Sequence, residues 1–371
     1  MNYIEDKRIV MTLDAGGTNL VFTALQGGKQ IISEITLPSN ADKLDTCISS
    51  IINGFEEVKK KLSVPPAAIS FAFPGPADYL NGIIGDLPNL PAFRGGVALG
   101  PLLADKFNLP VFINNDGDLF SYGEAIAGYL PYVNNLLEKS GSPKRYKNLL
   151  GLTLGTGFGA GITRDGNLFL GDNSIAGEIW LLRDVLSPSV NVEEHVSIRG
   201  LRKAYAKEEG VNFEDSPNPL ELYKIALGEQ QGNQQAAKEA FHKMAKVAGD
   251  AISNAITLID GLVVIGGGLA GASDVFLPYL IDEMNSNYIF PDGKKIKRLV
   301  ANVYNLEDEE QLNRFLKGSA KEIFIYNTNK KIKYDPELRI GVGISKLGAS
   351  RAIFIGAYAF ALKMLDEKNR I

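Results

Sequence analysis

The sequence predicts an α/β protein made of two related halves, each a mixed β-sheet with helices on its faces, with a cleft between them. Three observations predict it. Strands come first and then alternate with helices, in the order βββαβαβα, which is typical of a mixed sheet covered by helices. Glycine-rich turns follow the first strand of each half, at residues 14–19 and 155–159. The second half therefore repeats the plan of the first, and such internal duplication constrains the architecture strongly.

Composition limits the classes of protein to consider. A length of 371 residues allows two to three domains. A net charge of −4 lacks the basic footprint of a nucleic-acid binder. Cys47 is the one cysteine, so an intramolecular disulfide and a cysteine-rich zinc site are both excluded, and two histidines cannot form a three-histidine metal centre. Without an apolar run of membrane-spanning length or a signal peptide, we expect a cytoplasmic protein that contacts no membrane.

The first half opens with strand-like segments. Strands are expected over residues 3–14, 19–25, 30–37, 67–73 and 111–113. Between them, apolar residues recur at three- and four-residue steps from Leu44 to Leu62, which predicts a helix with one apolar face. A second helix is expected over 101–107, and a third runs through Ala127. We place the first domain at residues 1–117.

The second half follows the same order. Strands are expected over residues 149–154, 160–163, 168–170 and 261–265, and a long helix has one apolar face through 241–259. Residues 285–347 look irregular apart from a possible strand over 321–327, and a final helix covers 349–365. We therefore expect a second, larger domain at 118–356 with an irregular insertion at about 285–347. The C-terminal helix, 357–371, is expected to pack back on the first domain.

The two glycine turns are candidate phosphate sites. One contains Asp14, Gly16, Gly17 and Thr18, and the other contains Gly155, Thr156, Gly157 and Gly159. Glycine amides and threonine hydroxyls are suitable donors to phosphate oxygens, and a carboxylate such as Asp14 suits a magnesium ion. The alternative is a pair of plain hairpins without a ligand, and the duplication favours the phosphate reading.

A second candidate is the Asn115-Asp116 pair, which follows a buried apolar strand. Ligands of α/β sheets sit beyond the carboxyl ends of strands, where a carboxylate can take a proton from an attacking hydroxyl. The alternative is structural, with Asp116 or Asp118 capping the next helix.

Three further motifs have weaker local signals. Pro74-Gly75-Pro76 and the segment 86–91 could wall a pocket, although ordinary turns explain them as well. Glu178 and the run Glu193-Glu194-His195 could bind sugar hydroxyls or could simply be surface charge. The run 266–268 is a glycine turn between a strand and a helix, which could contact a nucleotide but lacks the Rossmann spacing.

Taken together and in this order, the motifs resemble those of the ROK family (repressors, open reading frames and kinases) of sugar kinases. The resemblance runs from about Arg8 to Leu362. That family belongs to the actin, hexokinase and Hsp70 superfamily, so the resemblance implies two RNase H-like (actin-like ATPase) domains.

The resemblance also implies roles for individual residues. Asp116 would be the catalytic base. The implied sugar ligands are Gly75, Asn89, Asn115, Asp116, Glu178 and Glu193. The implied ATP and phosphate ligands are Asp14, Gly16, Gly17, Thr18, Asn19, Gly155, Thr156, Gly157, Gly267 and Gly268. Asp14 would also hold Mg²⁺ through water, and Glu194 is a one-residue alternative to Glu193.

Two departures from the family pattern stand out. The family carries a histidine three residues after the first sugar-binding glutamate, and this chain has Leu181 there. The family's zinc-binding cysteines are absent from residues 187–192, so no structural zinc is expected. Substrate contacts at the anomeric side of the sugar would therefore differ, and His195 could either fill the vacancy or pack beside the pocket.

The implied function is an ATP-dependent sugar kinase that phosphorylates a hexose hydroxyl, most simply the 6-OH, of glucose or an N-acetylhexosamine. ATP, Mg²⁺ and the sugar are its implied ligands, and family members are commonly dimers, which implies a homodimer. The alternatives are a catalytically weak sugar-binding protein and a sugar-sensing regulator. The regulator is disfavoured, because the first phosphate loop begins at residue 13 and leaves no room for a helix-turn-helix domain.

Overall fold

The computed structural model describes residues 3–15, 18–75, 77–85 and 91–368. Contacts between residues divide the chain into two compact units. The first comprises Met1–Ala127, Asn167–Gly177 and Leu347–Ile371, and the second comprises Gly128–Gly166 and Glu178–Lys346. Each unit is described by itself below.

The first unit is built on a mixed sheet. Its strands are β1 (Val10–Ala15), β2 (Asn19–Gln26), β3 (Lys29–Gln30), β4 (Ile35–Pro38), β5 (Ala68–Ala72) and β6 (Val111–Asn114). They lie in the order β3-β2-β1-β5-β6, with β4 paired to β2. β1 pairs antiparallel with β2 and parallel with β5, and β5 is parallel to β6. The carboxyl ends of β1, β5 and β6 therefore meet at one edge, where Asp14 lies opposite Ala72 and Ala72 lies opposite Asn114.

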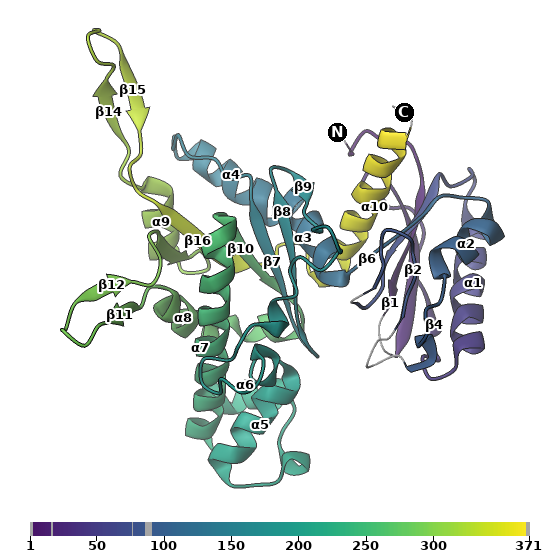
Figure 1. The fold of residues 1–371 in the computed structure, drawn as a ribbon, viewed down its shortest axis with the longest axis horizontal. Helices are drawn as coiled ribbons and strands as arrows, with labels where there is room; N and C mark the ends of the chain where they lie inside the picture. The colour runs from purple at the N-terminus through teal and green to yellow at the C-terminus, as the bar shows by residue number, and fades with distance from the viewer. Residues whose placement is uncertain (1–2, 16–17, 76, 86–90, 369–371) are drawn as a thin grey trace. The chain divides into compact units, whose positions relative to one another are not determined.

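Helices cover both faces of this sheet (Figure 1). They are α1 (Leu44–Lys61) and α2 (Leu99–Phe107) on one face, and α3 (Asp116–Ile126) and α10 (Ala349–Lys368) on the other, with the turn η1 (Pro91–Phe93) before α2. Cys47 is buried in α1 and belongs to the core on that face. α3 and α10 approach closely because each contributes a glycine. A Cβ on Gly123 or Gly356 would lie 2.0 Å from a carbonyl oxygen of the partner helix.

The second unit repeats this plan. Its main strands are β7 (Leu149–Leu154), β8 (Phe158–Arg164), β10 (Leu262–Gly266), β13 (Asn302–Asn305) and β16 (Arg339–Ile344), and the short β9 (Asn167–Leu168) follows β8 in the chain. The order is β13-β16-β10-β7-β8. β7 forms an antiparallel hairpin with β8, whereas β7, β10, β16 and β13 are parallel. As in the first unit, an antiparallel hairpin is extended on one side by parallel strands.

One large core lies between this sheet and its helices. The helices of that core are α5 (Ile198–Glu209), α6 (Pro219–Leu227), α7 (Gln234–Ile259) and α8 (Ser273–Met284). The unit also contains α4 (Tyr129–Lys139), α9 (Glu309–Lys317) and the short turns η2 (Ile179–Leu181), η3 (Val192–Glu194), η4 (Phe213–Asp215) and η5 (Gly268–Ala272). Two hairpins, β11 (Asn287–Ile289) with β12 (Lys295–Lys297) and β14 (Lys321–Phe324) with β15 (Lys331–Tyr334), extend away from the sheet (Figure 1).

The sequence prediction for residues 285–347 was wrong. This stretch is not irregular, since it holds two strands of the main sheet, β13 and β16, together with α9 and both hairpins. The strands are short, and β16 alternates apolar residues with Gly341 and Gly343. Glycine is depleted in strands, so the local signal was weak. It is required in β16, because a Cβ on Gly343 would lie 2.5 Å from the Tyr129 hydroxyl.

The contact-based division also runs differently from the expected bounds. Residues 118–127 fall in the first unit, because α3 packs against α10. All of Leu347–Ile371, rather than residues 357–371 alone, falls in that unit too. Within the described ranges, no helix combines the length and apolar character needed to cross a membrane.

Candidate active site

Asp14 and Asp116 lie at the same sheet edge of the first unit. Asp14 is near the end of β1, and Asp116 follows β6 at the start of α3. Burial raises the pKa of Asp14, and the charges of Asp116 and Glu34 raise it further, while a hydrogen bond with Ser350 lowers it. The two carboxylates are therefore close enough to repel one another, as the parallel order of β1, β5 and β6 requires.

Asn115, not Asp116 or Asp118, caps helix α3. The amide of Gly117 donates to Oδ1 of Asn115 at 2.8 Å and also to Oδ1 of Asp116 at 2.9 Å. Desolvation raises the pKa of Asp116, although the residue is exposed and the amide hydrogen bonds act in the opposite direction. The capping role thus passes to the neighbour and leaves the second carboxylate oxygen of Asp116 open to a substrate.

Gly75 and Asn115 meet around Tyr79, a residue that the sequence analysis missed. The Tyr79 hydroxyl donates to the carbonyl of Phe73 at 2.9 Å and accepts from Nδ2 of Asn115 at 3.4 Å. A Cβ on Gly75 would lie 2.2 Å from that hydroxyl, so glycine is required there. No pattern in the sequence singles out Tyr79, because it acts through a partner 36 residues away.

The other predicted residues of the first unit lie in the turn after β1 and in the segment before η1. Thr18 and Asn19 are exposed at the turn between β1 and β2, and the carbonyl of Thr18 accepts from the amide of Ser39 at 2.9 Å. Gly16, Gly17 and Asn89 lie outside the described residues.

In the second unit, the glycine turn at residues 155–159 lies next to the glycine turn at residues 266–268. β7 and β10 are parallel, with Gly266 opposite Thr153, so the turns that follow them adjoin. A Cβ on Gly267 would lie 2.3 Å from the carbonyl oxygen of Leu154. By contrast, apart from the chain neighbours, no atom of the described residues lies within 4 Å of a Cβ placed on Gly155 or Gly268. Bare backbone thus faces open space at both turns, and Thr156 is exposed between Gly155 and Gly157.

Glu193 packs directly on the first of these turns. Its Oε2 accepts from the amide of Phe158 at 3.0 Å. A Cβ on Gly157 would lie 2.6 Å from the same oxygen. The backbone is tied as well, since the amide of Ile198 donates to the carbonyl of Gly155 at 2.8 Å. Ser197 completes the segment by accepting from the amide of Gly200 as the cap of α5 and donating to the carbonyl of Glu193 at 2.8 Å.

Glu194 has different surroundings. Its carboxylate pairs with Arg199 and, at 3.1 Å, with Lys203, both on α5. These ion pairs lower the pKa of Glu194. The structure therefore separates the two glutamates, with Glu193 against the glycine turn and Glu194 engaged by the helix.

Glu178 accepts a hydrogen bond from the indole nitrogen of Trp180, and Leu181 has 59% of its surface exposed. His195 does not fill the position of Leu181. Its Nδ1 lies 2.5 Å from Oδ2 of Asp184, whose side chain is fully buried. The sequence analysis did not single out Asp184, which is 11 residues from its partner.

Oxygen ligands suited to magnesium are present in the first unit. A cation beside Asp14 would relieve the repulsion that Asp116 and Glu34 exert on this half-buried carboxylate, so the donor set fits Mg²⁺. The described residues contain no group of three or more histidine, cysteine, aspartate or glutamate side chains arranged to hold a metal ion.

Comparison with known proteins identifies the family. The ROK family profile matches residues 10–302. This chain belongs to the ROK family. The resemblance predicted from the motifs is therefore confirmed, as is the α/β mixed-sheet fold.

Several proteins and solved structures that are similar to this chain are named as kinases. An N-acetyl-D-glucosamine kinase of Photobacterium profundum is 26% identical over 276 residues, covering 69% of this chain and 83% of the relative. The structure of a glucokinase from Parabacteroides distasonis is 54% identical, with a TM-score of 0.88, and covers 98% of this chain and 99% of that one. A ROK family glucokinase from Streptomyces griseus, solved with glucose and AMPPNP, shares the fold with a TM-score of 0.60 at 16% identity, covering 96% of this chain and 99% of that one.

Proposed function

We propose that this ROK protein is an ATP-dependent sugar kinase that transfers the γ-phosphoryl group to a hexose, at the 6-hydroxyl of glucose or an N-acetylhexosamine. The relatives named glucokinase and N-acetyl-D-glucosamine kinase support the substrate class. The repeated sheet order of the two units supports two actin-like ATPase domains. The family resemblance further suggests a homodimer, which light scattering would check.

The observation that carries the proposal is the shared sheet edge of Asp14 and Asp116. A carboxylate fit to hold magnesium and one free to take a proton lie near enough to affect each other's ionisation. Phosphoryl transfer needs both functions near the reacting atoms. A protein that only bound sugar would gain nothing from this costly pairing of like charges.

In the proposed reaction, the hydroxyl oxygen of the sugar attacks the γ-phosphorus of ATP. The proton of that hydroxyl passes to the open carboxylate oxygen of Asp116, the new oxygen–phosphorus bond forms, and the bond to the β-phosphate oxygen breaks to release ADP. Asn115, fixed by Tyr79, orients the sugar. The amide of Gly155 already donates to the carbonyl of Gly157 at 3.0 Å, so the donors offered to phosphate oxygens are the amides of Thr156 and Gly268. Mg²⁺, held through Asp14, would neutralise charge on the phosphates.

Substitution of the base tests the reaction. Asp116→Asn keeps the shape and the hydrogen bond to Gly117 but cannot accept the proton, so turnover should fall by about 10²–10⁴. The measurement is ADP release with Mg-ATP and a panel of hexoses. Near-normal turnover by the variant on the preferred sugar would remove Asp116 from the role of base. If the wild-type protein binds a sugar but phosphorylates none of the panel, the kinase proposal fails.

The same panel addresses the position of transfer. A 6-deoxy analogue of the preferred hexose should bind but release no ADP, and phosphorus-coupled NMR of the product should place the phosphate on the C6 oxygen. Phosphorylation of the 6-deoxy sugar would show that another hydroxyl reacts.

A further inference from the structure

A polar cavity lies in the second unit, away from the glycine turns at residues 155–159 and 266–268. It has a volume of about 740 Å³ and opens at the amino ends of β7, β10 and β16. Six cationic side chains line it, whereas only two carboxylates do. The cations are Lys144, Arg145, Lys147, Arg164, Arg298 and Arg339. The carboxylates are Asp165 and Asp260. Nothing in the proposed reaction uses these residues.

Three of the cations are neutralised by carboxylates. Arg339 pairs with Asp335 at 2.5 Å and with Glu337 at 3.8 Å. Arg298 pairs with Asp250 at 3.3 Å and Lys147 with Asp165 at 3.1 Å. Charge on these three side chains is therefore already balanced within the protein.

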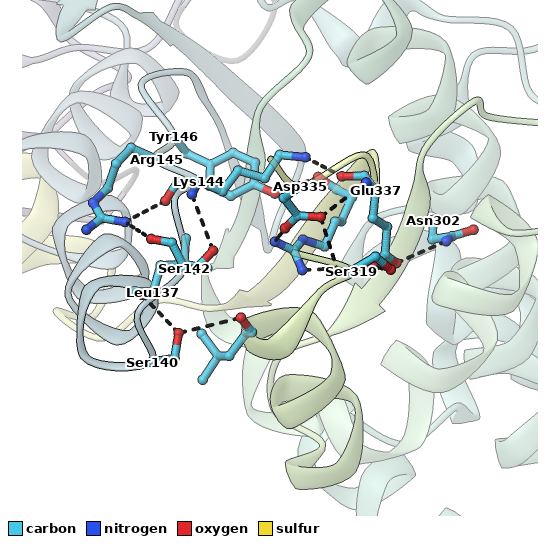
Figure 2. A network of polar contacts seen from close by, with 12 residues as sticks. Leu137, Ser140, Ser142, Lys144, Arg145, Tyr146, Asn302, Ser319, Asp335 and Glu337 are labelled. Carbon is cyan, nitrogen blue, oxygen red and sulfur yellow. Dashed lines mark hydrogen bonds and ion pairs between the residues drawn. The ribbon is translucent and has the colours of Figure 1, made fainter. Parts of the chain in front are cut away.

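The other three cations, Lys144, Arg145 and Arg164, form no ion pair with a carboxylate of the described residues. Lys144 donates to the backbone carbonyl of Glu337, and Arg145 donates to the carbonyls of Ser142 and Lys144 at 2.8 and 2.7 Å. Figure 2 shows the Arg145 guanidinium turned toward Ser142 and away from Asp335 and Glu337. Neutral carbonyls satisfy hydrogen bonds but leave the positive charge uncompensated.

Arg164 completes the set. It is exposed at the end of β8, and its side chain makes no hydrogen bond or ion pair with the described residues. Across the described lining, Asp260 is the remaining carboxylate without an ion pair. Glu337 is a second carboxylate beside Arg339, at 3.8 Å. Six cations against Asp165, Asp260 and the three paired carboxylates outside the lining therefore leave a net charge of about +1, so the cavity favours an anion such as a phosphate.

The segment that carries Lys144 and Arg145 is held in place by the contacts of Tyr146. The Tyr146 hydroxyl donates to the carbonyl of Arg339 at 2.7 Å, and its ring stacks on Phe315 with 5.8 Å between centroids. The amide of Tyr146 is also fixed by Asn134 at 2.8 Å. Burial, and after it the positive charge of Arg339, lowers the pKa of Lys144, while the charges of Asp335, Glu337 and Asp260 act in the opposite direction. An anion would meet a preformed arrangement rather than a loose chain.

We propose that this cavity binds a phosphorylated metabolite, at a site distinct from the nucleotide turns. Asn148 and Gly155 flank the two ends of β7, seven residues apart. At the rise of a strand, the cavity and the glycine turn are therefore separated by roughly 20 Å. One phosphate cannot touch both. The cavity is a second anion site, and its ligand is recognised by Lys144, Arg145 and Arg164.

Direct binding measurements test the proposal. Calorimetry is performed on the full chain with AMPPNP and the preferred hexose present at saturation, so that the active site is filled. The probes are inorganic phosphate, a hexose 6-phosphate and AMP, which distinguish a free anion, a sugar phosphate and a nucleotide as the source of the phosphate. At least one probe is expected to bind with a Kd below about 1 mM, and raising the salt should weaken it.

The matched variants decide the location. Arg145→Gln with Arg164→Gln should weaken that binding at least tenfold, because charge-assisted hydrogen bonds are lost. Lys207→Gln with Lys224→Gln removes the same charge from exposed positions on α5 and α6 and should leave it unchanged. If the first pair disturbs folding, Arg164→Gln alone serves, since this exposed side chain makes no hydrogen bond or ion pair with the described residues.

No binding of any probe would overturn the proposal, and so would equal affinity in the wild type and the Arg145/Arg164 variant. Both outcomes are read from binding alone, so they stand whether or not the protein proves to be a kinase.

Discussion

Asp14 is a half-buried carboxylate kept among other carboxylates. Burial and the charges of Asp116 and Glu34 raise its pKa, and its hydrogen bond with Ser350 only partly offsets them. Ionised Asp14 therefore costs the folded protein free energy when no cation is present. Unfavourable ionisation of this kind is typical of functional sites, where a bound ligand stabilises the charge.

A substitution at Asp14 separates stability from activity. Because the pKa of Asp14 is higher in the folded state than in the unfolded state, ionisation of Asp14 destabilises the folded protein at pH values above the folded-state pKa. This destabilisation disappears when the pH falls below the ordinary pKa of aspartate, since the carboxyl group is then protonated in both states. Asp14→Asn should therefore be more stable than the wild type at pH 7, with the difference shrinking toward pH 3.5, while kinase turnover falls. Urea unfolding at both pH values measures it. A variant less stable than the wild type at pH 7 would contradict the expectation.

For single residues, the sequence predicted the site residues that follow strands but not the side chains that hydrogen-bond to them. Asp14, Asn115 and Asp116 could be found because the end of a buried strand is visible in the local pattern. Tyr79 and Ser350 could not, because each acts on a residue far along the chain. The capping of α3 by Asn115 rather than Asp116 is likewise a matter of three-dimensional geometry, because both side chains suit the role.

At the scale of the elements, the segment from Glu178 to Ser197 is held by the contact between Asp184 and His195, which the family pattern does not predict. A backbone bridge pairs Arg183 with Asn191. Oδ1 of Asp184 accepts from the amides of Leu186 and Ser187 at 2.7 and 2.9 Å, and its Oδ2 contacts His195. The segment thereby places η3, and with it Glu193, against the glycine turn.

Loss of His195 should weaken this segment. His195→Ala leaves Oδ2 of the buried Asp184 without its partner, so the free energy of unfolding should fall by about 1–3 kcal/mol. His242→Ala is the matched control, because the other histidine has 48% of its side chain exposed and should change stability by less than about 0.5 kcal/mol. Urea unfolding of the three proteins provides the comparison. Equal stability of both variants would mean that the Asp184–His195 contact does not contribute to the free energy of unfolding.

How well the elements could be predicted depended on their length and surroundings. The strand expected over 149–154 and the end of the long helix at Ile259 match β7 and α7, since buried runs and extended apolar faces are strong signals. The single strand expected over 30–37 is two separate strands, β3 and β4. β13 and β16 were missed because sheet pairing, rather than local propensity, defines strands of four to six residues.

On the scale of the whole molecule, each unit holds part of the proposed machinery. The carboxylates Asp14 and Asp116 belong to the first unit, and the glycine turns at residues 155–159 and 266–268 belong with Glu193 to the second. The order of motifs in the sequence was sufficient to predict the family, which the profile match confirms. The site residues themselves stay predictions, for which contacts within each unit give support.

Ligand binding should raise the stability of the whole protein. A sugar that binds only the folded state adds about 2.7 kcal/mol to the free energy of unfolding at a concentration of 100 Kd. Under the proposed roles, Glu193→Gln should lose most of this gain at the same sugar concentration. Glu194→Gln, whose carboxylate is engaged by Arg199 and Lys203, should retain it. Thermal unfolding with and without the preferred hexose reports the effect, and the opposite ranking would exchange the roles of the two glutamates.

The contact between Gly157 and Glu193 links two positions that alignments usually treat separately. Because a Cβ at position 157 would collide with Oε2 of Glu193, the glycine serves the carboxylate as well as the open turn. The two positions should therefore coevolve, so that a lineage could replace Gly157 only after its partner had shortened or moved. Loss of activity on changing Gly157 would accordingly report a displaced carboxylate, and it should not by itself be taken as a defect in nucleotide binding.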